Sequence, residues 1–192
     1  MVDDRQGKRR PKRQRERRIA PALDEAHLRE LALHYAARFA TTRLKLLRYL
    51  ARKLKERGWA GEQPADTEAL AERLVELGYV NDAAWASMKG RAMTARGLGH
   101  RRVAEELTAA GVAIDDRGEM PDEQAAMATA LAFARRKRLG PFAREISDDP
   151  AMSQKTRQKA FAVMVRAGHP MAAVRAVLAA RTAAEAEALI GE

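Results

Sequence analysis

Four histidines, and pairs of neighbouring acidic residues such as Asp115-Asp116 and Asp148-Asp149, are the side chains that could carry catalysis or bind a metal ion. His27, Glu30 and His34 can share one face of a helix. However, two histidines seven residues apart with one carboxylate are a poor match to known zinc spacings, and no HExxH motif occurs. We therefore expect these two histidines, together with His100 and His169, to lie at the surface rather than to act as ligands.

The stretch RGLGHR at 96–101 is the other candidate for chemistry, since glycine-rich loops can bind phosphates. It follows no predicted strand and lacks both a third glycine and a following Lys-Ser/Thr pair, so neither dinucleotide nor P-loop binding is indicated. We expect Gly97 and Gly99 to allow the backbone to turn. The pairs Asp115-Asp116 and Asp148-Asp149 stand beside glycine or proline in polar stretches, which is typical of solvated turns.

The chain contains no cysteine, which excludes a disulfide, a thiolate metal site and a cysteine nucleophile. We therefore expect a protein that is not an enzyme and uses no metal or cofactor. The charged N-terminus has no apolar core behind it, and no run of 18 apolar residues occurs. These features predict a cytoplasmic protein without a membrane segment, and we expect a monomer.

Positive charge is concentrated at the N-terminus. The net charge is +10, and residues 1–18 alone hold nine Lys/Arg against three acidic residues. Because this stretch has little apolar surface to bury, residues 1–20 are predicted to form a basic arm that is disordered when free. Such an arm favours contact with nucleic acid or an acidic partner, and a merely solubilising tail is the alternative.

A second concentration of positive charge lies in the predicted helix 42–57, which has seven Lys/Arg and a single acid, Glu56. The following segment, 62–82, has six acids and one cation, Arg73. This segregation predicts either an exposed basic ridge beside an acidic strip or pairing between adjacent helices, and the sequence favours neither. The best candidates for contact with a partner or DNA are five cations of this helix and four arginines between 91 and 102. They are Arg43, Lys45, Arg48, Arg52, Lys53, Arg91, Arg96, Arg101 and Arg102.

The elements that must position these residues are helices. A composition rich in Ala, Leu, Arg and Glu favours helix, and apolar residues recur at spacings of three and four. Asp24, one of Thr41 and Thr42, and one of Asn81 and Asp82 are predicted N-caps. The predicted inner face of the helix that begins near 82 consists of Trp85, Met88 and Ala92. We predict eight helices and leave a ninth open, since 114–121 has room for a turn or a very short helix.

Three glycines, Gly58, Gly111 and Gly168, are predicted to end helices at intervals of 53 and 57 residues. Residues eight and four positions before each glycine can all face a core. This layout predicts an elongated all-α array of three tandem three-helix, helix-turn-helix-like repeats, in which each repeat buries its apolar stripe against its neighbours. An ordinary globular bundle is the alternative. The predicted units are the arm 1–20 and repeats 21–80, 81–120 and 121–192, the second with a short or missing third helix.

The chain resembles the RecX family, bacterial regulators of the recombinase RecA. The resemblance covers about residues 25–180 and is carried by GYVNDAAWA with the following Arg91, by RGLGHRRVAEELTAAGV, and by ARRKRLGPF with RQKAFAVMVRAG. The first repeat departs from the family pattern, because TTRLKLLRYL lacks the Ser-Arg-x-Glu-Leu type of start and GWAGEQPAD looks lengthened.

The resemblance implies a fold of three tandem three-helix repeats and a non-enzymatic inhibitor. RecX proteins bind RecA filaments on single-stranded DNA, lie in the filament groove, and suppress ATP hydrolysis, strand exchange and co-protease activity. The resemblance therefore implies the RecA filament on single-stranded DNA as the partner. The alternative left by the residues is a non-specific single-stranded nucleic-acid-binding helical protein, in which the basic arm and the 42–57 ridge contact phosphates directly.

Overall fold

A computed structural model describes residues 21–144 and 150–190, and all regular elements in these residues are helices. The backbone pairs like a strand at one point, a parallel bridge between Leu23 and Trp59. The all-α prediction is therefore confirmed for the described part of the chain. The predicted arm 1–20 and the Asp148-Asp149 pair lie outside it.

The first group of helices is α1 (Glu25–Arg38), α2 (Arg43–Arg57) and α3 (Thr67–Glu76). As predicted, Asp24 caps α1 and Thr42 caps α2, each accepting a hydrogen bond from a backbone N–H of the first turn. These helices enclose a cluster of buried side chains drawn from all three. Its members are Leu23, Leu28, Ala32, Ala36, Leu46, Leu50, Ala71, Leu74 and Val80.

The second group is α4 (Asp82–Ala95), α5 (His100–Ala109) and one turn of 3-10 helix, Asp115–Arg117. The turn before α4 is short because Gly78 has a φ of 75° and Asn81 caps the next helix. The predicted inner face of α4 is partly wrong. Trp85 is buried, but Met88 and Ala92 are exposed, and α4 instead buries Ala86 and Met93.

The third group is α6 (Glu123–Lys137), a 3-10 turn (Gly140–Phe142), α7 (Pro150–Arg166), α8 (Met171–Ala179) and α9 (Ala183–Ala188). The helix α9 was not predicted. This group contains the largest cluster of buried side chains, which are Ala130, Leu131, Phe133, Ala134, Ala160, Met164, Ala167, Ala173, Val174, Val177, Leu178 and Ala186.

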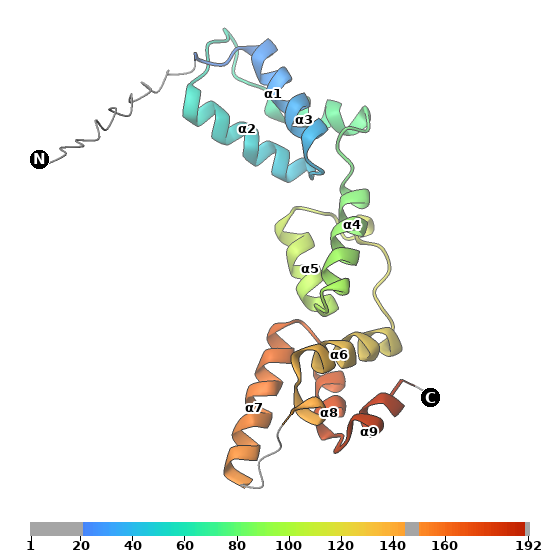
Figure 1. Cartoon of the computed structure of the whole chain (residues 1–192). Helices are drawn as coiled ribbons and strands as arrows, with labels where there is room; N and C mark the ends of the chain where they lie inside the picture. The colour runs from blue at the N-terminus through green and yellow to red at the C-terminus, as the bar shows by residue number, and fades with distance from the viewer. Residues whose placement is uncertain (1–20, 145–149, 191–192) are drawn as a thin grey trace, which may run out of the picture.

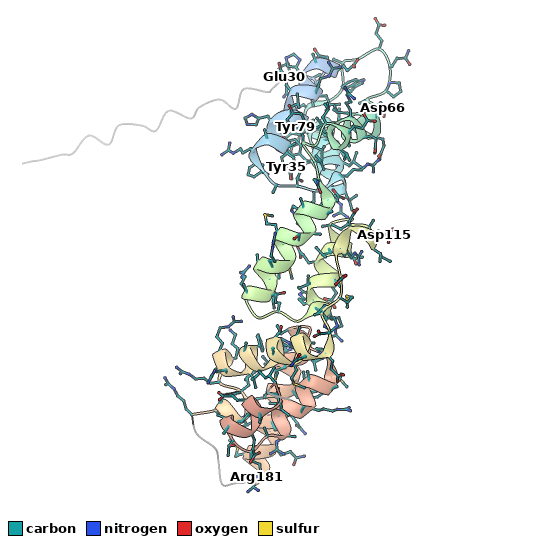
Figure 2. All side chains as sticks on the ribbon, turned by 90° about the vertical axis from the view of Figure 1, so that its right-hand side faces the viewer. Glu30, Tyr35, Asp66, Tyr79, Asp115 and Arg181 are labelled. Carbon is teal, nitrogen blue, oxygen red and sulfur yellow. The ribbon has the colours of Figure 1, made fainter. Side chains whose placement is uncertain are left out.

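The three groups follow one another in an elongated array (Figure 1). Figure 2 shows Glu30 and Asp66 near one end of the molecule and Arg181 at the other. Gly58, Gly111 and Gly168 all have positive φ, at 80°, 80° and 91°, as expected for residues that follow a helix. The tandem arrangement agrees with the prediction, while the count of three repeats and their boundaries stay a prediction.

Candidate partner-binding surface

The cations at the start of α2 contact other helices rather than facing solvent freely. The guanidinium of Arg43 donates to Glu68 at 2.6 Å and to Glu72 at 3.0 Å, and both glutamates belong to α3. Its backbone N–H donates to the carboxylate of Asp82, at the start of α4, at 2.8 Å. For Arg43, pairing between adjacent helices is therefore correct and the free basic ridge is wrong.

The N-terminus of α2 is fastened to the C-terminus of α5. The buried hydroxyl of Thr42 donates to the carbonyl of Ala110 at 2.6 Å while it accepts from the N–H of Lys45. The guanidinium of Arg48 donates to the neighbouring carbonyl of Ala109 at 3.0 Å. Because the last carbonyls of a helix have no partner within the helix, donors from α2 complete the end of α5.

Lys45 belongs to the same junction. Its Nζ lies 3.8 Å from the centroid of the Trp85 ring, which is within the range of a cation–π interaction. Burial lowers the pKa of Lys45, while Glu106 opposes the shift. Burial also raises the pKa of Asp82, against the hydrogen bond from the backbone of Arg43. These groups are therefore positioned to hold α2 against α4 and α5.

Further along α2, two candidate cations share one carboxylate. Arg52 Nε lies 3.6 Å and Lys53 Nζ 2.6 Å from oxygens of Glu56. Both cations also lie near the ring of Tyr49, at 5.5 and 5.9 Å from its centroid, and Tyr49 stacks on Tyr35. This end of the predicted ridge is exposed, but its charge is partly offset within the helix.

A second junction joins the N-terminus of α5 to the C-terminus of α7. The N–H groups of Gly99 and Arg101 donate to the carbonyls of Ala167 and Gly168, at 2.9 and 3.3 Å. The guanidinium of Arg101 also donates to Val165 at 3.0 Å. The glycine-rich stretch 96–101 therefore packs against the α7–α8 loop, and Gly99 must be small because a Cβ there would overlap the backbone of Gly168. Gly97 has a φ of 74°, so the prediction that a glycine lets the backbone turn is confirmed there. Gly99 has a φ of −73°, and its role is the close approach to Gly168 instead.

Arg102 pairs with Glu105 at 2.9 Å within α5. Among the described residues, the side chains of Arg91 and Arg96 make no hydrogen bond or ion pair. Arg91 lines a cavity of about 360 Å³ between the second and third groups, together with His100, Arg117 and Thr129. Of the nine predicted contact residues, these two are thus the arginines most available to a partner.

The histidines differ in part from their prediction. His169 is 2% exposed, so its assignment to the surface is wrong. Its Nε2 lies 3.1 Å from the carbonyl of Gly97, to which it must donate, and its Nδ1 has no partner in the described structure. Burial lowers its pKa. His27 is exposed and bonds Asp24, and no group of three potential metal ligands occurs in residues 21–144 and 150–190.

The charge analysis of the sequence missed a further set of cations in the third group. Residues 150–181 contain six Lys/Arg and no acidic residue. Within the described ranges, no carboxylate pairs with any of the six, although Arg166 donates to the carbonyl of Ala162 at 3.2 Å. The ion pair that the third group does make joins Arg135 to Glu187. The absence of acids over 32 residues was a signal that could have found them. The five of these cations whose side chains make no hydrogen bond or ion pair in the described residues are Lys155, Arg157, Lys159, Arg175 and Arg181.

None of the helices in the described ranges is both long and apolar enough to cross a membrane. No protein-family model matches the chain. A curated protein from Myxococcus xanthus (strain DK1622), named "Regulatory protein RecX", is 33% identical over 188 residues, which is 91% of this chain and 93% of the relative. The likeness therefore covers nearly the full length of both proteins. The chain therefore belongs to the RecX family.

Proposed function

We propose that the protein inhibits RecA by binding the RecA filament on single-stranded DNA, and that it suppresses ATP hydrolysis, strand exchange and co-protease activity without catalysing a reaction itself. Membership of the RecX family carries this proposal. The proposed setting is the cytoplasm, where the filament would form.

The elongated array supports the proposal physically. The three groups of helices form an elongated array (Figure 1). Because a filament presents the same surface at regular intervals, such a ligand can contact several subunits at once. Each added contact acts at a high effective concentration, which strengthens binding without a tight individual site. The junctions between the groups use backbone hydrogen bonds at 2.9 and 3.3 Å and a buried hydroxyl bond at 2.6 Å, which hold the groups at fixed spacings.

Arg91 and Arg96 are the proposed contact residues, because their side chains have no partner in the described part of the chain. The remaining seven candidates already contact this protein's own carboxylates, carbonyls or rings. A partner that bound these cations would first have to break those contacts, and the free energy lost would offset part of the binding free energy.

The test is a titration of the DNA-dependent ATPase of RecA with this protein. We expect stoichiometric amounts to suppress ATP hydrolysis and strand exchange, and the double variant Arg91→Gln/Arg96→Gln to require a higher concentration. The matched control is Arg52→Gln/Lys53→Gln, which also removes two cations and should inhibit like the wild type. Unchanged ATPase and strand exchange at stoichiometric wild-type protein would refute the proposed function.

The alternative, direct binding of phosphates by the arm and the 42–57 ridge, is less favoured. Arg43, Lys45 and Arg48 are engaged in contacts between helices, so the ridge offers fewer free charges than its sequence suggests. Deleting residues 1–18 would test the arm, since filament inhibition should mostly survive the deletion.

A further inference from the structure

The strongest unassigned feature of the molecule is the groove between α7 and α8. It has a volume of about 480 Å³ and is lined by Gln154, Arg157, Gln158, Phe161 and Arg175, with Leu178 and Ala179 completing it. The first four of these side chains are spaced i, i+3, i+4 and i+7 along α7, so they share the face of the helix that meets α8. Two guanidinium groups, two amides and one ring are therefore gathered in one groove.

Arg157 extends this positive region beyond the groove. It also lines a neighbouring hollow of about 750 Å³ with Arg181, Ser153 and Thr156. Arg157 thus lies between two depressions, each with a second arginine. Glu185 accepts a hydrogen bond from the backbone N–H of Arg181 at 2.8 Å, not from its guanidinium.

Three cations on α2 have carboxylate partners, whereas those on α7 and α8 have none among the described residues. Arg43, Arg52 and Lys53 on α2 each lie within 4 Å of a glutamate oxygen. In the described residues, Arg157 and Arg175 have no such partner, and the stretch 150–181 contains no acid at all. A polyanion that binds at α7 and α8 therefore displaces no internal ion pair, whereas one that binds on α2 must compete with carboxylates.

We infer that the α7–α8 groove binds single-stranded nucleic acid, with Arg157 and Arg175 pairing with phosphates. Guanidinium groups bind phosphate oxygens in a bidentate manner. Amides and a ring inside the same groove suit unpaired bases, which can stack on aromatic side chains and present their edges, whereas a duplex keeps both hidden. This inference goes beyond the proposed function, because the site needs no RecA.

The experiment measures binding of the full chain to a fluorescent oligothymidylate over a series of salt concentrations, without RecA. Each phosphate contact to a single strand contributes about 0.7 to the slope of log affinity against log salt. Arg157→Gln/Arg175→Gln should therefore lower that slope by about 1.4 and weaken binding most at low salt. Arg52→Gln/Lys53→Gln is the matched control and should leave the slope near the wild-type value. The arm is present in all variants, so its contribution cancels in the comparison.

A third variant tests the bases. Phe161→Leu keeps an apolar side chain but removes the ring, and it should weaken binding by about tenfold while the salt slope stays unchanged. Far-UV circular dichroism and a melting curve confirm that each variant is folded.

Three results would overturn the inference: no binding by the wild type, an equal or larger loss of slope in the α2 control, or unchanged affinity in Phe161→Leu. A groove that serves an acidic protein instead would keep oligothymidylate binding in the double arginine variant but lose binding to polyglutamate. The proposed function is tested by a different assay, the titration of RecA with the wild type and with the Arg91→Gln/Arg96→Gln variant. Its failure can therefore be told apart from failure of the groove.

Discussion

Replacing Thr42 with valine should destabilise the protein more than the loss of an ordinary helix cap. The hydroxyl of Thr42 caps α2 and donates to the carbonyl of Ala110, and both residues are at most 1% exposed. Losing a cap costs about 1 kcal/mol. Leaving a buried carbonyl without a donor costs a further 1–3 kcal/mol, roughly. Because valine has nearly the shape of threonine, no cavity forms, and the expected loss in the free energy of unfolding is about 2–4 kcal/mol.

Two control variants separate these contributions. Thr182 caps α9 through the same kind of bond, at 3.1 Å, but it is exposed and joins no other helix. Thr182→Val should therefore cost about 1 kcal/mol. Thr42→Ser keeps the hydroxyl, and we expect it to cost roughly half a kcal/mol or less.

Urea denaturation is the assay, followed both by circular dichroism and by tryptophan fluorescence. Trp85 lies beside the junction and Trp59 lies in the first group, so coincident midpoints from the two signals are needed before a two-state free energy is assigned. If Thr42→Val costs no more than Thr182→Val, the hydroxyl bond to Ala110 contributes nothing to stability. The argument for a fastened junction would then fail.

Two further predictions concern the second junction. Gly168→Ala should cost more in the free energy of unfolding than Gly78→Ala, as measured by urea denaturation. Both glycines have positive φ, which costs an L-residue about 1–2 kcal/mol, but a Cβ on Gly168 also meets the backbone of Arg102, whereas Gly78 has open space. Equal costs would contradict the close packing. Wild-type stability should also fall as pH drops below about 6.5, because His169 is buried and its folded pKa lies below its unfolded value. The loss in the free energy of unfolding can reach about 1.4 kcal/mol per pH unit down to the folded pKa. Between pH 7.5 and 5.5, His169→Gln should lose less of its free energy of unfolding than the wild type does. A pH dependence equal to that of the wild type would refute this assignment.

Local signals in the sequence predicted the helices and their ends well. A cap such as Asp24 or Thr42 acts on the N–H groups two or three residues ahead, so its effect can be read from neighbouring residues. The helix α9 escaped prediction because it is a six-residue run of alanine and glutamate that buries only Ala186, and such a run has no apolar periodicity.

Distant contacts explain what the sequence could not predict. Arg43 meets glutamates 25 and 29 residues away, and Arg48 meets a carbonyl 61 residues away. Whether a cation is free or engaged depends on how helices dock, which periodicity does not encode. The inner face of α4 was misjudged for the same reason. Trp85 is buried as predicted, but contacts with other helices bring Ala86 and Met93 inward in place of Met88 and Ala92.

Both junctions join the beginning of one helix to the end of another, so α7, α5 and α2 run head to tail along the molecule (Figure 1). At both junctions main-chain carbonyls accept hydrogen bonds, from the side chains of Thr42 and Arg48 at one and from the N–H groups of Gly99 and Arg101 at the other. These bonds help to set the spacing between the groups. Outward-facing side chains can therefore change during evolution while the spacing between the groups of helices stays constant. We expect distant members of the family to share this spacing even where their surface charges differ.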